Sequence, residues 1–122
     1  MSQLTSKSLG ERGETLAAEY LTQHGYRVLA RNWRTRLGEL DIVAESADGI
    51  RVFVEVKSRH TAEANPLESI TLRKRKLLVS TAHYYLTEQQ LNDTHWRFDV
   101  ISVIFAPHQR PRIEHYQDAF DW

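Results

Sequence analysis

The 122-residue sequence contains no cysteine, which excludes a disulfide framework, a thiolate zinc site and a cysteine nucleophile. It also lacks net charge, because sixteen Lys and Arg balance sixteen Asp and Glu. Any binding of nucleic acid must therefore come from local clusters of charge. The longest apolar stretch, residues 100–106, is too short to cross a bilayer, and residues 1–7 lack the apolar segment of a signal peptide. We expect a soluble, cytoplasmic protein.

Proline and glycine are also scarce, at three and five residues, and no Ser/Gly-rich stretch or internal repeat divides the chain. With 41% hydrophobic residues, a chain of this length buries roughly two-thirds of its unfolded surface without a metal or a disulfide. We expect one domain over residues 1–122.

The spacing of apolar residues predicts two helices and four main strands. The predicted helices are residues 9–24, ended by Gly25, and residues 71–87; the predicted strands are residues 26–31, 39–45, 51–58 and 97–105, with an edge strand in the tail after residue 112. The order α-β-β-β-α-β predicts an α/β fold with a mixed sheet flanked by helices.

Alternation within the strands predicts which side chains share a face of the sheet. Glu55 and Lys57 emerge together. If the turn after residue 45 is odd-membered and centred on Asp48, Asp41 lies directly opposite Glu55; a two-residue turn would send the two carboxylates to opposite faces. The same register joins two aliphatic sets, and a third is expected in the first strand: Leu40, Ile42 and Ala44 with Val52, Val54 and Val56, and Tyr26, Val28 and Ala30.

Two facing carboxylates repel each other, and a divalent cation would relieve that repulsion. Carboxylate oxygens suit Mg²⁺, which commonly binds one or two carboxylates together with waters and substrate phosphates. Lys57 would orient a water or neutralise charge that develops on a phosphate. The pattern therefore favours a phosphodiester hydrolase with Asp41, Glu55 and Lys57 in its active site. The other interpretation is a solvated sheet face that carries a cross-strand Glu–Lys pair.

Three segments carry a family resemblance: Gly38–Val43 (GELDIV), Val52–Arg59 (VFVEVKSR) and Arg97–Val100 (RFDV). Together with Gly13 and Glu14 in the first helix and Asn32 after the first strand, they resemble the bacterial YraN-like family of predicted endonucleases. That family is similar to the restriction-endonuclease-like PD-(D/E)xK superfamily and to archaeal Holliday-junction resolvases.

The resemblance implies a three-layer core and a set of roles for the site. Asp41, Glu55 and the carbonyl of Val56 would bind Mg²⁺ or Mn²⁺, and Lys57 would be the catalytic lysine. Glu14 would add a further carboxylate, as in the resolvase-like branch. For Glu14 the alternative is an ordinary first-turn carboxylate that the helix dipole favours.

Local clusters of positive charge are the candidates for phosphate contact. Lys74 and Arg75 lie at the start of the second helix, where cations oppose the helix dipole unless an anion is near. Arg75 stands where the family often has glutamine. Arg34 and Arg36 belong to an arginine run that also contains Trp33, and Arg59 follows the Glu-x-Lys motif. The alternative for both clusters is a solvated charged surface.

These observations favour a Mg²⁺-dependent endodeoxyribonuclease that holds DNA by its backbone and shape. By analogy with the resolvases, its substrate would be branched or flapped DNA, and a symmetric homodimer would cut two strands. Two alternatives stay open. One is a non-catalytic nucleic-acid-binding module with a vestigial site; the other is a protein-interaction adaptor that uses Trp122 and the acidic tail.

Overall fold

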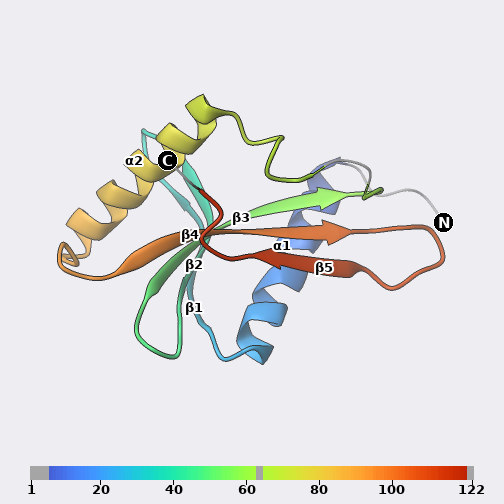
Figure 1. Cartoon of the computed structure of the whole chain (residues 1–122), viewed down its shortest axis with the longest axis horizontal. Coiled ribbons are helices and arrows are strands. Elements are labelled where there is room, and N and C mark those ends of the chain that lie inside the picture. The colour runs from blue at the N-terminus through green and yellow to red at the C-terminus, as the bar shows by residue number, and fades with distance from the viewer. Residues whose placement is uncertain (1–5, 63–64, 121–122) are drawn as a thin grey trace.

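The computed structural model describes residues 6–62 and 65–120, so Trp122 lies outside the described residues. Its elements are α1 (Ser6–Gln23), β1 (Arg27–Arg34), β2 (Glu39–Glu45), β3 (Arg51–Arg59), α2 (Leu72–Glu88), β4 (Trp96–Ile104) and β5 (Arg112–Tyr116). The five strands form one sheet in the order β1-β2-β3-β4-β5 (Figure 1). Only β3 and β4 run parallel within it. The predicted order, mixed sheet and edge strand are confirmed.

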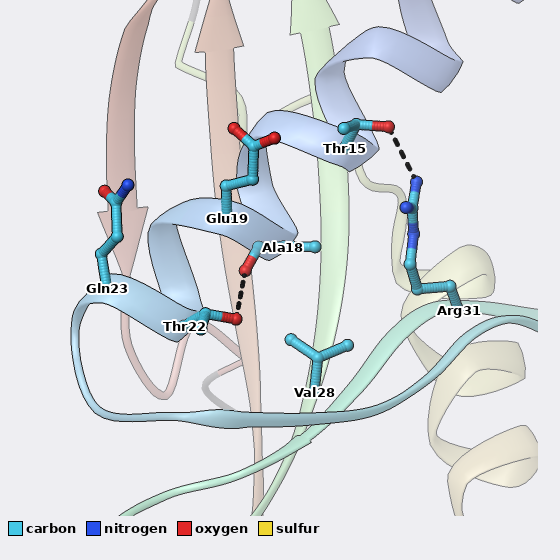
Figure 2. Close-up of a pocket in the computed structure, with 7 residues that line it drawn as sticks. All are labelled: Thr15, Ala18, Glu19, Thr22, Gln23, Val28 and Arg31. Carbon is cyan, nitrogen blue, oxygen red and sulfur yellow. Dashed lines mark hydrogen bonds between the residues drawn. The ribbon is translucent and has the colours of Figure 1, made fainter.

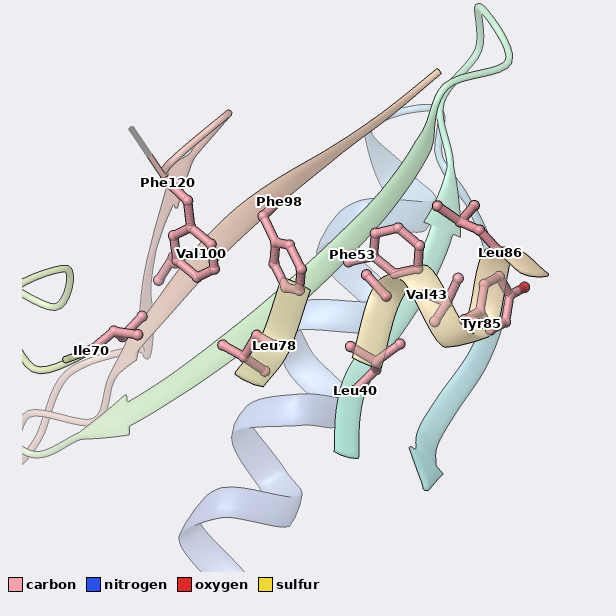
Figure 3. Packing of buried hydrophobic residues seen from close by; sticks show 11 residues of the cluster. Leu40, Val43, Phe53, Ile70, Leu78, Tyr85, Leu86, Phe98, Val100 and Phe120 are labelled. Carbon is pink, nitrogen blue, oxygen red and sulfur yellow. The ribbon is translucent and has the colours of Figure 1, made fainter. Parts of the chain in front are cut away.

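The core is divided between the two faces of the sheet. Ala17 and Leu21 of α1 are fully buried against one face, in a cluster with Ile42, Val54 and Ile101. The other face packs under α2 (Figure 3). Its buried residues include Leu40, Val43, Phe53, Leu78, Ala82, Tyr85, Leu86, Phe98, Val100 and Phe120. The predicted layering of helix, sheet and helix is therefore observed.

The ends of both helices are set by local backbone bonding. Gly25 has φ +87° and ends α1, as predicted, with Tyr26 N–H donating to the Leu21 carbonyl at 3.0 Å. Thr71 is the N-cap of α2, and its hydroxyl accepts from the Lys74 backbone N–H at 3.1 Å. In the part of the chain that the structure describes, no helix combines the length and apolar character needed to cross a lipid bilayer.

Two of the sets of apolar residues that were predicted to share one face of the sheet do not share it. Both errors come from irregular backbone in β1 and β2. The pairing of β1 with β2 shifts between Val28 and Ala30, so Val28 packs on the α1 side and Ala30 on the α2 side. Leu40 joins the α2 cluster, whereas Ile42 and Ala44 join the α1 cluster. Leu40 pairs with Trp33, which directly follows the left-handed residue Asn32 (φ +53°).

A charged network on the α1 face ties β4 to β5. Asp99 is fully buried and accepts from Arg97 Nε at 3.0 Å, from His115 Nε2 at 2.7 Å and from the Asp118 backbone N–H at 3.0 Å. Burial alone would raise the pKa of Asp99, but these hydrogen bonds outweigh burial and hold the pKa below its usual value. Asp99 therefore acts as an ionised cross-link that fixes the last strand.

Removing this carboxylate should destabilise the fold. Asp99→Ala leaves Arg97 and His115 without their buried partner, and we expect a loss of about 3 to 5 kcal/mol in the free energy of unfolding, measured with urea at neutral pH. Because the folded pKa of Asp99 is lowered, its contribution is present above the ordinary value of 3.8 and disappears as the pH falls through the folded pKa. The exposed-residue control Glu19→Ala should change stability by less than about 0.5 kcal/mol. Equal stability of the two variants would contradict the assignment.

Candidate active site

The register of the β2–β3 hairpin brings two carboxylates together. Residues 46–50 form a five-residue turn, which is the odd-membered loop that the sequence requires. The ladder pairs Ile42 with Val54 and Ala44 with Val52. The same register, continued by one residue, sets Asp41 opposite Glu55, and the two side chains are within hydrogen-bond reach of each other.

Asp41 lies where the pairing of β2 with β3 ends. The last paired residues are Ile42 and Val54, so Val56 has no ladder partner on β2. Its backbone N–H donates instead to Asp41 Oδ2 at 2.9 Å. Since the N–H and C=O of a strand residue point toward the same neighbouring strand, the Val56 carbonyl also opens toward this gap. The strand end thus presents a carboxylate and a carbonyl side by side.

Glu55 lies under the first turn of α2. Its side chain is only 6% exposed, and Oε2 is 3.7 Å from Lys74 Nζ, on a half-exposed side chain. The sequence predicted an anion near this helix start, where cations oppose the dipole. The structure supplies one from the protein itself.

The electrostatics of Asp41 follow from this crowding. Burial is the largest effect, followed by the contact with Glu55, and together they raise the pKa of Asp41 from 3.8 to about 8. The Val56 N–H and the Lys74 ammonium oppose that rise. At neutral pH the pair therefore holds a proton that an ordinary aspartate would have lost.

Glu14 of α1 is a third carboxylate beside Asp41. Burial and then the nearby Asp41 raise the pKa of Glu14, while a hydrogen bond from the Asn32 side chain lowers it. Because α1 begins at Ser6, Glu14 is not in the first turn, and the helix-dipole interpretation of this residue does not apply. The structure brings Glu14 to the site.

Two residues without reactive side chains hold Glu14 in place, and the sequence did not reveal their roles. Gly13 lies against β3 so closely that a Cβ there would be 1.8 Å from Ser58 Oγ and 3.0 Å from Ser58 Cβ. Asn32 adopts a left-handed backbone, which asparagine tolerates better than most residues, and its side chain reaches Glu14. Both residues belong to the family resemblance, and that is the signal that marks them.

Lys57 shares the sheet face of Glu55, as expected from the alternation, and lies half-buried one strand position further on. Its partner on β4 is the buried Ser102. The lysine is therefore positioned beside the acidic pair on the same strand, at the end that α2 leaves uncovered.

The predicted phosphate contacts are only partly brought together. Lys74 reaches the site, and Arg59 lies on β3 beyond Lys57, where it donates to Ser102 Oγ at 3.3 Å. Arg75 instead holds the preceding loop, since its guanidinium donates to the carbonyls of Ile70 and Leu67 at 3.1 Å each. Its guanidinium carbon also lies 5.6 Å from the centre of the Phe120 ring. These contacts occupy Arg75 and give it a structural role.

The arginine run is spread along β1 and the turn after it. Arg34 Nε lies 3.4 Å from Glu39 Oε1, with its side chain largely exposed. Arg36 is exposed in the turn between β1 and β2. At the other end of β1, Arg27 pairs with Glu45 at 3.1 Å, far along the strand from Asp41, and is not part of the site.

Hard oxygen donors at this strand end fit Mg²⁺ or Mn²⁺. They are the carboxylates of Asp41 and Glu55 and the carbonyl of Val56, and Mg²⁺ characteristically completes such a set with waters and substrate phosphates. Within residues 6–62 and 65–120, no three acidic or histidine side chains converge on one point as a metal cage. The site is thus suited to an ion that shares its coordination with a substrate.

Two hollows on the surface are separate from the acidic pair. One, of about 400 Å³, is an open groove between α1 and β1 lined by polar side chains together with Ala18 and Val28, where Arg31 donates to Thr15 Oγ1 (Figure 2). The other, of about 130 Å³, lies at the ends of β3 and β4. Neither of these two hollows is lined by Asp41 or Glu55.

The fold and this strand end define a mixed α/β protein with an acidic pair and a following lysine on its central strand. Residues 13–103 match the profile of the uncharacterised protein family UPF0102. The chain belongs to this family, also called YraN, as the resemblance predicted.

Curated relatives cover nearly the whole chain. UPF0102 proteins from Trichlorobacter lovleyi and Clostridioides difficile are each 41% identical to it, over 95% and 96% of this chain and 92% and 100% of their own lengths. The relative from Chloroflexus aurantiacus is 51% identical over 80% of this chain and 79% of its own length.

Solved structures show weaker likenesses. An EndoMS–dsDNA complex matches with a TM-score of 0.47 and 18% identity, covering 80% of this chain and 37% of that protein. A repair endonuclease from Pyrococcus abyssi matches with a TM-score of 0.46 and 16% identity, covering 88% and 42%. The chain therefore corresponds to less than half of each of these two proteins.

The crowded carboxylates predict an unusual pH dependence of stability. Because the folded pKa of Asp41 is raised, its contribution to stability is present below 3.8 and is lost as the pH rises toward about 8. Asp41→Asn keeps an acceptor for the Val56 N–H and gains an amide that can donate to Glu55. In metal-free buffer we expect this variant to be at least about 1 kcal/mol more stable than wild type at pH 8, with the difference vanishing near pH 4.

Thermal or urea unfolding across this pH range measures the effect, and Asp93→Asn in the exposed turn before β4 is the matched control. A wild-type protein that is more stable than Asp41→Asn at pH 8 would show that the two carboxylates do not repel each other in the folded state.

Proposed function

We propose that this protein is a divalent-metal-dependent endonuclease that hydrolyses phosphodiester bonds in DNA. One observation carries the proposal: the end of β3 presents Glu55, the Val56 carbonyl and Lys57 in succession, with Asp41 of β2 in contact with Glu55. Two carboxylates that contact each other in a largely buried place are costly to the fold unless they have a use.

Asp41, Glu55 and the Val56 carbonyl would hold Mg²⁺ or Mn²⁺. When bound, such an ion acts as a Lewis acid on a phosphate and lowers the pKa of water. The residues contribute by their placement: the Val56 N–H holds Asp41 Oδ2 at 2.9 Å, which fixes the orientation of that carboxylate. The burial of Glu55 restricts its side chain in the same way.

Lys57 and Glu14 would serve the reacting groups from two sides. An ammonium one strand position from Glu55 stabilises negative charge that develops on a phosphate, or orients the attacking water. Glu14, held by Asn32 on the α1 side of Asp41, supplies a carboxylate that can accept a proton from that water. Burial and the nearby Asp41 raise the pKa of Glu14, which makes its carboxylate a better proton acceptor than an ordinary glutamate.

DNA is the substrate that the resemblance to nucleases supports, and the charge distribution is consistent with it. The chain has no net charge, yet cationic side chains of Lys74, Lys57 and Arg59 lie on the same side of the sheet as the acidic pair. They favour a polyanion at this place. Branched or flapped DNA is the substrate class that the likeness to resolvases suggests.

Cleavage should require both the acidic pair and the lysine. In Mg²⁺ or Mn²⁺, purified protein should cut labelled branched, flapped or linear DNA, and Asp41→Asn and Lys57→Met should each lower the rate at least about 100-fold. Asp93→Asn and Lys76→Met, at exposed positions, are the matched controls and should retain wild-type rates. Circular dichroism of each variant checks that the fold is intact.

Metal binding gives a second readout that does not depend on turnover. Millimolar Mn²⁺ should raise the melting temperature of the wild type and leave that of Asp41→Asn unchanged, because a ligand stabilises only the state that binds it. Full cleavage by folded Asp41→Asn or Lys57→Met would overturn the proposal. DNA binding by the wild type without cleavage in either metal would favour the non-catalytic binding module.

A further inference from the structure

The strand register beyond the acidic pair builds three rows of side chains on the α2 face of the sheet. Directly paired residues on neighbouring strands point to the same face. The rows, from β3 across β4 to β5, are Glu55–Val100–Tyr116, Lys57–Ser102–Glu114 and Arg59–Ile104–Arg112. The rows therefore lead from the candidate metal site, past the candidate catalytic lysine, to a pair of arginines.

The third row forms one side of a small hollow. Ile104, 4% exposed, lies at its base, belongs to neither of the two main hydrophobic clusters, and separates the two arginines. The hollow has a volume of about 130 Å³ and is lined by His60, Thr61, Ala62, Ile104, Ala106, Gln109, Arg110 and Arg112. Figure 1 shows that this end of β3, β4 and β5 extends past α2, which leaves the face uncovered.

The hollow is positively charged. Arg110 and Arg112 line it, Arg59 adjoins it through Ile104, and none of its described lining residues is acidic. The nearest described carboxylate is Glu114 in the second row, whose Oε2 lies 3.6 Å from Arg112 Nη2 and whose Oε1 accepts from the Tyr116 hydroxyl at 3.3 Å. Arg110 and Arg112 line the hollow and Glu114 contacts only the second of them, so its described lining carries more positive than negative charge.

We propose that this hollow, here called the arginine groove and defined by Ile104, Arg110 and Arg112, binds a backbone phosphate of the DNA whose cleavage is proposed above. The assignment rests on the proposed function for its substrate class, but binding in the groove does not require catalysis. Four residues of strand separate Glu55 from Arg59, or about 13 Å. Because the backbone of a duplex winds around its axis, neighbouring phosphates of one strand lie about 7 Å apart, so the phosphate would lie about two nucleotides from the scissile bond.

Arginine suits this position because its guanidinium matches a phosphate with two parallel hydrogen bonds. Ile104 keeps the floor of the groove apolar and so limits the water that competes for those bonds. The second row separates the groove from the acidic pair, so an anion in the groove does not meet the charges of Asp41 and Glu55 directly. The two sites can thus hold two phosphates of one strand at a fixed spacing.

The test compares two arginines that are matched in their surroundings. Arg112 on β5 and Arg27 on β1 lie on opposite edge strands, are 62% and 73% exposed, and each lies within 4 Å of a glutamate. Binding of a labelled flapped or linear duplex is measured by fluorescence anisotropy in EDTA, over a series of salt concentrations. Arg112→Gln and Arg110→Gln should each weaken binding roughly three- to tenfold and reduce the salt slope by about 0.9, and Arg27→Gln should change neither.

A methylphosphonate scan locates the contact. Replacing single phosphates by neutral linkages should weaken wild-type binding at a position about two nucleotides from the cleaved bond, and the same substitution should have no further effect in Arg112→Gln. Equal losses in Arg112→Gln and Arg27→Gln would overturn the proposal, because they would reflect total charge alone. Displacement of the DNA by poly-glutamate at equal charge would also overturn it, in favour of an acidic protein partner.

The outcomes separate this proposal from the nuclease proposal. DNA binding that depends on Arg112, without cleavage in Mg²⁺ or Mn²⁺, would sustain the arginine groove and remove the catalytic function. If cleavage depends on Asp41 but Arg112→Gln and Arg110→Gln bind the DNA as tightly as the wild type, the nuclease proposal stands and the arginine-groove proposal is wrong.

Discussion

The repulsion between Asp41 and Glu55, imposed by the register of the β2–β3 hairpin, is the constraint on which the rest of the site depends. A turn one residue longer or shorter would send the two carboxylates to opposite faces. The aliphatic residues prevent that slip, because Val52 and Val54 pack with Ile42 and Ala44 under α1. The burial of the α1 cluster thus enforces the contact between two charges that would otherwise separate. The energy of the core is what holds the acidic pair together.

Two buried aspartates in the same sheet, Asp99 and Asp41, differ in their hydrogen-bond partners and therefore in the direction of their pKa shifts. Asp99 receives four hydrogen bonds, two from Arg97 and one each from His115 and a backbone N–H, and its pKa is lowered. Asp41 receives one backbone N–H and faces another carboxylate, and its pKa is raised. The first arrangement satisfies its charge within the protein, whereas the second leaves a demand for positive charge that an external cation can meet. That difference supports the proposal that Asp41, rather than Asp99, is the functional residue.

The sequence predicted the parts of the fold that follow from local alternation and failed where the backbone is irregular. The register that sets Asp41 against Glu55 follows from the parity of the regular part of the hairpin, residues 42–45 and 51–54, and the end of α1 follows from Gly25. The shift at Val28 and the left-handed Asn32 break the alternation of β1, and no composition signal distinguishes such a break from a regular strand. The sequence shows that Arg75 is charged but not where its side chain points. Its hydrogen bonds to the carbonyls of Leu67 and Ile70 could therefore be seen only in the structure.

Lys74 links the charge at the start of α2 with the acidic pair of Asp41 and Glu55. A cation in the first turn of α2 opposes the helix dipole, and the sequence therefore demanded an anion nearby. In the structure that anion is Glu55, whose Oε2 lies 3.7 Å from Lys74 Nζ. The helix start and the acidic pair therefore stabilise each other in the absence of any ligand. A divalent cation at Asp41 and Glu55 would take over the neutralisation that Lys74 now provides. The half-exposed lysine would then be released toward the phosphate that arrives with the metal, so that one side chain serves the folded resting state and the bound state in turn.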